Sequence, residues 1–279
     1  MAKRKSEWTE EKIARYIKAG KGQGEMEEYT PWLNIQDFSS NGNVTRLNGW
    51  KTKRKHEFFS NLERDYFYLL DWSEDVRDIR EQFVLDREQT FEIAKEKGIN
   101  HSIDNRSKTI IPMTTDFFVT LYKNGDWIYL ARTVKPSMDL EKPRTIEKFE
   151  IEREYWERKG VDWGIITEKE LSKELVKNIQ WVHKFYFLDS EDEELIALDL
   201  LKVLNSNLNN LNLKIIRICN EFDENYNLEI GSAVIYFKHL IARKIIRLNM
   251  MEKVDIRKLD ISEITIKDDG GEKIDYISS

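Results

Sequence analysis

Residues 113–135 read MTTDFFVTLYKNGDWIYLARTVK and contain the strongest local structural signal in the chain. Two segments rich in β-branched and aromatic residues, Met113–Tyr122 and Trp127–Lys135, flank the dipeptide Asn124-Gly125. Asn-Gly is favoured in two-residue β-hairpin loops because both residues accept a positive φ. We therefore predict an antiparallel hairpin with its loop at Asn124-Gly125.

The loop position also fixes which residues of the two strands face each other. Paired residue numbers must sum to 249, the sum for the two loop residues. Asp116 then lies opposite Thr133, and Lys135 lies on the same face one diagonal step away. The register predicts that a carboxylate, a hydroxyl and an amine gather at the open end of the hairpin.

A helix with one buried face is predicted upstream, where apolar residues recur at helical spacing between residues 62 and 70. Ser60 and Glu63 have the spacing of a capping box, in which each side chain bonds the other residue's backbone at the start of the helix. Glu63 therefore has a structural explanation as a cap, and it also places a carboxylate in the first helical turn.

The remaining pattern predicts an α/β core followed by a mainly helical region. A helix from Thr145 to Gly160, a short apolar strand at Trp163–Ile166 and a helix from Thr167 to about Lys184 follow the hairpin. Farther on, residues 195–220 and 228–249 look helical, and residues 254–257 and 261–267 look like short strands. We expect domains at residues 1–170 and 171–279. The second is winged-helix-like or a generic helical domain, and it interacts with partner proteins or with DNA.

Composition excludes several classes of protein. The single cysteine, Cys219, rules out an internal disulfide framework and a thiolate zinc cluster, and the four histidines lack metal-finger spacing. No segment has the roughly 20 apolar residues that cross a bilayer, and the start lacks the apolar stretch of a secretion signal, so we expect a cytoplasmic protein with no membrane partner.

Charge is unevenly spread along these 279 residues. The formal net charge is −6, but residues 1–60 hold 12 Lys and Arg against 8 Asp and Glu, a net charge of +4. Basic residues concentrate at Ala2–Lys5 and Lys51–His56. These segments are either phosphate contacts or solvated loops, and composition leaves both interpretations open.

Glu63, Asp116 and Lys135 are the parts that a hydrolytic metal site on DNA requires. Carboxylate oxygens hold Mg²⁺, the metal polarises a phosphate, and the lysine orients the nucleophile or offsets developing charge. The same residues also fit a helix cap and a cross-strand ion pair. Spacing by itself does not decide between a nuclease and these structural roles.

The chain resembles the TnsA family, the endonuclease subunit of the heteromeric transposase of Tn-seven-type bacterial transposons. The family's catalytic domain is similar to type II restriction enzymes, so the resemblance implies an α/β, restriction-endonuclease-like PD-(D/E)xK core. The blocks that carry the resemblance are Ala14–Lys18, Gly20–Gly24, Tyr29–Leu33, Leu62-Glu63, Asp78–Phe83, Thr115–Phe117, Val134–Pro136 and Glu147–Trp156.

The resemblance also implies the site residues. The family's catalytic glutamate, aspartate and lysine fall on Glu63, Asp116 and Lys135. Its metal ligands fall on Glu63, Asp116, Thr133 and the backbone carbonyl of Val134, with Mg²⁺ as the cofactor and Mn²⁺ as a substitute. Thr133 departs from the family, which has Glu or Gln two residues before the lysine, and a hydroxyl is a weaker metal ligand than a carboxylate.

The implied function is Mg²⁺-dependent cleavage of the 5′ ends of the transposon during cut-and-paste DNA transposition. The implied partners are the DNA of the transposon ends, an integrase-like (TnsB-like) transposase subunit and an ATP-dependent (TnsC-like) regulator, with residues 171–279 serving the two proteins. Two alternatives remain open. Thr133 fits a non-catalytic assembly subunit of the transposase, and the same fold also serves stand-alone restriction-like or repair nucleases.

Overall fold

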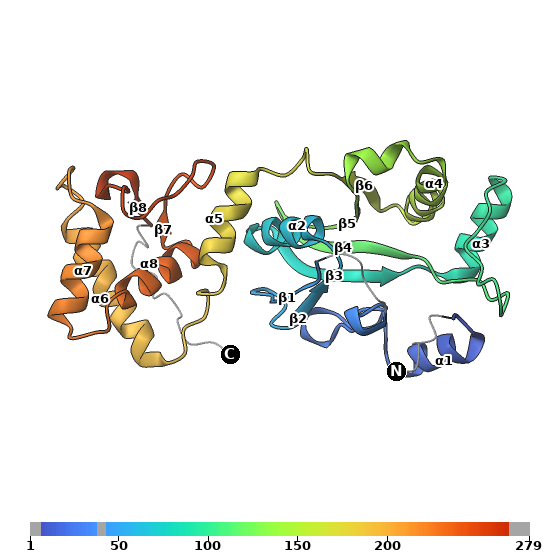
Figure 1. Ribbon diagram of the computed structural model, residues 1–279, viewed down its shortest axis with the longest axis horizontal. Helices are drawn as coiled ribbons and strands as arrows, with labels where there is room; N and C mark the ends of the chain where they lie inside the picture. Colours follow the sequence, from blue (N-terminus) through green and yellow to red (C-terminus); the bar gives the residue numbers. More distant parts are fainter. Residues whose placement is uncertain (1–6, 38–42, 268–279) are drawn as a thin grey trace. The chain divides into compact units, whose positions relative to one another are not determined.

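A computed structural model describes residues 7–37 and 43–267 (Figure 1). The chain divides into two compact units, Met1–Leu171 and Ser172–Ser279. The assignment of catalysis to the first unit and partner binding to the second stays a prediction. The basic segment Ala2–Lys5 lies outside the described residues. No helix in the described part of the chain is long and apolar enough to cross a membrane.

The first unit is built on a four-stranded mixed sheet with strand order β3-β4-β5-β6. The first three strands are antiparallel, and β6 runs parallel to β5, because the chain crosses over between them through a helix, α4. The bounds are β3 Val76–Val84, β4 Thr114–Lys123, β5 Asp126–Val134, α4 Pro143–Arg158 and β6 Asp162–Ile166. The predicted mixed α/β class is confirmed.

The hairpin of β4 and β5 has the predicted register. Facing pairs run from Lys123 with Asp126 to Phe117 with Arg132, and every pair sums to 249. Asn124 and Gly125 have φ values of 54° and 92°, as a two-residue loop with two positive φ angles requires.

Helices cover both faces of this sheet. Alternate residues of β4 point to opposite sides, so Phe117 packs with Phe67 of α2 (Asn61–Trp72) while Phe118 packs with Trp156 of α4. The remaining elements of the first unit are α1 Glu10–Lys18, η1 Met26–Glu28, η2 Ile35–Asp37, β1 Thr45–Asn48, β2 Lys55–Phe58, α2 Asn61–Trp72, α3 Arg87–Glu96 and η3 Ser137–Glu141.

Two helix starts differ from the predictions. Helix α4 begins at Pro143 rather than after Thr145, because proline is well tolerated in the first turn, where its missing N–H costs nothing. Thr167 and Glu170 do bond each other, but no helix follows them directly. The next helix is α5, Lys173–His183, which is capped by Ser172.

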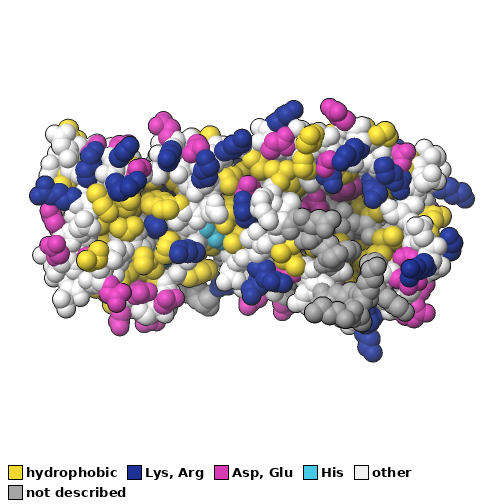
Figure 2. Space-filling model, in the orientation of Figure 1, with side chains coloured by type: hydrophobic (Ala, Val, Ile, Leu, Met, Phe, Trp, Pro, Cys, Tyr) yellow, Lys and Arg dark blue, Asp and Glu magenta, His cyan; other side chains and the backbone are white. Residues whose placement is uncertain are grey.

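The second unit consists mainly of helices. They are α5, α6 Glu191–Ser206, α7 Ile215–Asn225 and α8 Ser232–Ala242, followed by β7 Ile246–Arg247, η4 Ile261–Glu263 and β8 Thr265–Ile266. The predicted helix at 195–220 is interrupted between α6 and α7. The predicted strand at 254–257 is wrong, since the partner of β8 is β7. The surface carries acidic and basic side chains side by side (Figure 2).

Candidate active site

Asp116, near the start of β4, is held at both of its carboxylate oxygens. Oδ2 accepts a hydrogen bond of 2.8 Å from the backbone N–H of Val134, and Oδ1 accepts one of 3.2 Å from the side-chain amide of Gln82. Burial raises the pKa of Asp116. The carboxylate is therefore fixed between β3 and β5 and does not rotate freely.

Gln82 orients Asp116 from an uncommon backbone conformation. Its φ is 49°, which non-glycine residues rarely adopt, and its side chain is buried. The amide oxygen of Gln82 accepts a hydrogen bond from the Thr114 hydroxyl at 3.1 Å, which leaves the amide nitrogen directed at Asp116. Backbone strain of this kind gathers at functional sites.

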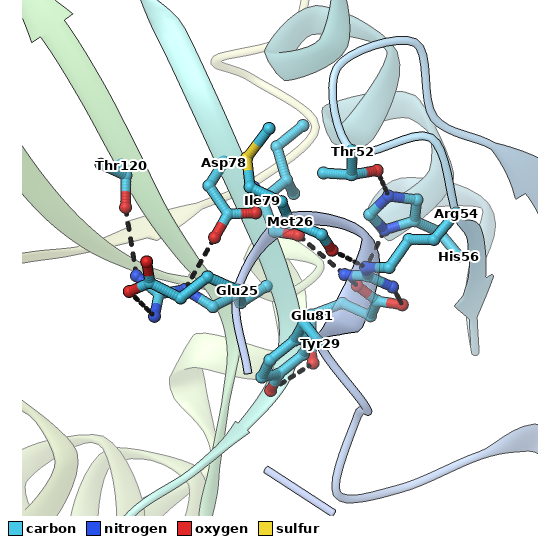
Figure 3. A network of polar contacts seen from close by, with 11 residues as sticks. Glu25, Met26, Tyr29, Thr52, Arg54, His56, Asp78, Ile79, Glu81 and Thr120 are labelled. Carbon is cyan, nitrogen blue, oxygen red and sulfur yellow. Dashed lines mark hydrogen bonds and ion pairs between the residues drawn. The ribbon is translucent and has the colours of Figure 1, made fainter. Parts of the chain in front are cut away.

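The residue before Gln82 anchors the same strand through a buried ionic network (Figure 3). Glu81 accepts hydrogen bonds from the Arg54 guanidinium, one of them 2.8 Å long, and from Nδ1 of His56 at 2.8 Å. Burial by itself raises the pKa of Glu81, but the charges and hydrogen bonds of His56 and Arg54 outweigh it and lower the pKa to about 2. Two members of the basic segment Lys51–His56 thus stabilise the fold and are not available for phosphate.

Glu63 occupies the first turn of α2. Ser60 caps this helix as predicted, but the capping box is not completed, because the Glu63 carboxylate bonds the N–H of Phe59 and not that of Ser60. The Glu63 carboxylate accepts hydrogen bonds from the N–H of Phe59 at 3.1 Å and from the Ser60 hydroxyl at 2.8 Å, while Ser60 Oγ accepts from the N–H of Glu63. Burial and then the negative charge of Asp116 raise the pKa of Glu63 to about 7. Glu63 is therefore both a cap and an electrostatic neighbour of Asp116.

Lys135 follows β5 at the same end of the sheet. Its positive charge lowers the pKa values of both Glu63 and Asp116, although burial outweighs that effect at each of them. Among residues 7–37 and 43–267, no carboxylate lies within ion-pair distance of Lys135. A simple cross-strand ion pair between Asp116 and Lys135 is thus not formed, and the amine remains available to a ligand.

Thr133 bonds a residue that the sequence did not single out. Its hydroxyl donates to the carboxylate of Glu152 on α4, which also accepts a 2.7 Å hydrogen bond from Thr115. Burial and then the charge of Asp116 raise the pKa of Glu152 to about 7, against the opposing effect of the two hydroxyls. The structure therefore pairs Thr133 with Glu152, not with Asp116 as the register suggested, and brings a third carboxylate to the site.

Glu152 had a detectable signal in the sequence. It lies three and four residues before Tyr155 and Trp156, on the apolar face of α4 that packs against the sheet. A carboxylate on such a face is uncommon because it loses hydration without gaining an ion pair. The pattern marks it for attention, whereas its partners become known only from the packing of α4 on β5.

Lys148 adds a second amine near Lys135. It lies one helical turn before Glu152 on α4 and makes no ion pair within the described part of the chain, whereas Arg144, Arg153 and Arg158 of the same helix all pair with glutamates. Partial burial, followed by the positive charges of Arg144 and Lys135, lowers the pKa of Lys148. Uncompensated cations beside buried carboxylates suit a substrate with a phosphate group.

The donor set fits a divalent cation, although the described side chains do not form a complete metal site by themselves. No group of three or more His, Cys, Asp or Glu side chains in residues 7–37 and 43–267 is arranged to enclose a metal ion. Nevertheless, Glu63 and Glu152 both have raised pKa values to which burial and the Asp116 charge contribute. A bound cation would favour the ionised form of each of these carboxylates.

Together, the mixed sheet and its buried carboxylates beside an unpaired lysine have the chemistry of a phosphodiester hydrolase. Two family models match consecutive parts of the chain: TnsA-like endonuclease N terminal matches residues 73–168, and TnsA endonuclease C terminal matches residues 170–250. The class of protein is thus an endonuclease.

A comparison with curated proteins gives the family. The chain is 37% identical over 262 residues to Transposon Tn7 transposition protein TnsA of Escherichia coli, covering 92% of this chain and 93% of the relative. The chain belongs to the TnsA family, which confirms the resemblance seen in the sequence blocks.

Proposed function

We propose that this chain is the Mg²⁺-dependent endonuclease subunit of a heteromeric transposase and hydrolyses a phosphodiester at the 5′ ends of a transposon during cut-and-paste transposition. The observation that carries the proposal is that the negative charge of Asp116 raises the pKa of both Glu63 and Glu152, which places three carboxylates near one another, with Lys135 beside them. Burying several carboxylates close together destabilises the fold, which a purely structural site would avoid.

Glu63, Asp116 and the backbone carbonyl of Val134 would hold Mg²⁺, or Mn²⁺ in its place, with Thr133 and Glu152 next to them. The bound metal would polarise the phosphate and lower the pKa of a water molecule. Capping does not prevent Glu63 from serving as a ligand, because each carboxylate oxygen has two lone pairs and each of its oxygens accepts one hydrogen bond here.

The chain's own residues would then position the substrate. Gln82 and the N–H of Val134 hold Asp116 in one orientation, so little reorganisation is needed when the site is filled. Lys135 offsets negative charge at the reacting phosphate, and Lys148 contacts a neighbouring phosphate. Glu152 accepts the hydrogen bond of the Thr133 hydroxyl and adds negative charge that the metal would balance.

At the level of fold, we propose that the mixed sheet with α2 and α4 forms the restriction-endonuclease-like core. The second unit would be the winged-helix-like module that meets a TnsB-like transposase subunit and a TnsC-like regulator. The support for these partners is the similarity of the chain to a Tn7 transposition protein of Escherichia coli.

Strand cleavage with the partner transposase tests the proposal. Asp116→Asn keeps the side-chain shape and should abolish 5′-end nicking, whereas Asp126→Asn, at an exposed site of the same hairpin, should leave nicking intact. Equal nicking by Asp116→Asn and wild type would refute the site. An inactive wild-type protein would favour the non-catalytic alternative, and efficient double-strand cutting without the partner would favour a stand-alone nuclease.

A further inference from the structure

The second unit carries three cations that lie over aromatic rings between the end of α5 and α8. We call this group the aromatic–cationic patch. Its members are Trp181, Lys184, Phe185, Tyr186, Lys238 and Arg243.

The rings hold the charged groups in place. Nζ of Lys238 lies 4.8 Å from the ring centroids of both Trp181 and Phe185, and Nζ of Lys184 lies 4.6 Å from Phe185. The Arg243 guanidinium carbon lies 5.0 Å from the Tyr186 ring centroid. Contacts of this geometry are attractive, and they reduce the conformational entropy that a long side chain would lose on binding a ligand.

The three cations lack acidic partners. Within residues 7–37 and 43–267, no Asp or Glu oxygen lies within ion-pair distance of them, whereas other cations of this unit pair with acids, as Lys202 does with Asp199 at 2.8 Å. Two acidic side chains next to α8 have other partners: Glu194 contacts His239 at 3.1 Å, and Asp223 accepts hydrogen bonds from the N–H groups of Gly231 and Ala233. Partial burial and the charge of Lys184 lower the pKa of Lys238.

The sequence places further positive charge just after the end of α8. Residues 238–247 hold four Lys and Arg and no Asp or Glu, although residues 172–279 hold 15 Lys and Arg against 19 Asp and Glu, a net charge of −4. Positive charge is therefore collected locally in an acidic unit. That arrangement is unfavourable in the free protein and would be relieved by a bound polyanion.

We propose that the aromatic–cationic patch binds the phosphate backbone of double-stranded DNA without sequence specificity. An acidic peptide is the other polyanion to consider, but lysine is depleted in protein–protein interfaces, where aromatic rings themselves make the contact. Here the cations lie over the rings and present charge. Lys and Arg are the usual contacts to DNA phosphates, and DNA is the substrate class of an endonuclease.

The patch belongs to the second unit and the proposed metal site to the first, so the contribution of the patch would be to affinity and not to the chemical step. Each phosphate contact displaces counterions, and the logarithm of the binding constant falls against the logarithm of salt concentration with a slope of about −0.9 per contact. Removing two cations should therefore reduce the slope by about 2 and weaken binding roughly 10- to 100-fold near 0.1 M salt.

Fluorescence anisotropy of the full chain with a labelled random-sequence duplex tests the proposal, in EDTA and over a range of salt concentrations. The test variant is the double substitution Lys184→Gln and Lys238→Gln, and thermal melting checks that it folds. Lys202→Gln, which removes an exposed cation of the same unit, is the matched control, and Lys184→Arg with Lys238→Arg should retain binding.

Unchanged affinity and salt slope in the double Gln variant would overturn the proposal. A second result would also overturn it. In that result, a poly-glutamate peptide competes fully with DNA for the wild-type protein, and the double Gln variant no longer binds the peptide but still binds DNA. The result is independent of cleavage, because binding is measured in EDTA and its outcome does not require the assigned metal site to be correct.

Discussion

Replacing Glu152 with Gln should change how the stability of the first unit depends on pH. The amide has the shape of the carboxyl group and its oxygen can still accept hydrogen bonds from Thr133 and Thr115. What the substitution removes is a titrating group that is only 3% exposed and feels the charge of Asp116.

The sign of the effect follows from linkage. Burial and the Asp116 charge raise the pKa of Glu152 from 4.5 to about 7, so the folded state binds a proton more tightly than the unfolded state. Stability is then highest below about pH 4.5 and falls as pH rises toward 7. A shift of this size corresponds to about 3 kcal/mol, because one pKa unit is worth about 1.4 kcal/mol.

Urea unfolding of wild type and Glu152→Gln at pH 5 and pH 8 measures this effect. From pH 5 to pH 8, we expect the free energy of unfolding of the variant to rise by about 2–3 kcal/mol relative to that of wild type. The variant should nevertheless lose nicking activity, although it is the more stable protein at pH 8. Glu147→Gln, on the exposed side of α4, is the control for removing a charge from this helix. A difference between wild type and Glu152→Gln that is the same at pH 5 and pH 8 would refute the reasoning.

Three further substitutions test other parts of the site. Gln82→Gly keeps the positive φ but removes the amide that bonds Asp116, so it should weaken Mn²⁺ binding, measured by calorimetry, about tenfold. Gln82→Asn should have an intermediate Mn²⁺ affinity. Unchanged Mn²⁺ affinity in both variants would contradict the positioning role of Gln82. Glu81→Gln should remove an acid-sensitive stabilisation of about 3 kcal/mol that wild type retains above pH 4.5 and loses as pH falls to about 2, which acid unfolding curves will show. Thr133→Glu should lower thermal stability by about 2–4 kcal/mol, because it forces a second carboxylate against buried Glu152, and a melting temperature equal to wild type would contradict that packing.

Local chemistry accounts for what was predicted correctly. The hairpin register depends on two adjacent residues that accept a positive φ, and the Ser60 cap on the N–H of Glu63 joins residues three apart. Both are decided within a few residues of chain, so neighbouring packing does not alter them. The predicted helix across residues 207–214 failed because helical periodicity does not show where tertiary contacts end a helix.

The sequence by itself therefore determined the hairpin, the mixed α/β class and the family of this protein. Only the tertiary structure decided the partners within the site: Thr133 with Glu152, 19 residues apart, and Gln82 with Asp116, 34 residues apart. Desolvation and charge act between side chains brought together by packing, whatever their separation in the chain. For that reason the same carboxylates that a pattern can only mark as candidates acquire their shifted pKa values, and their expected chemistry, from the fold.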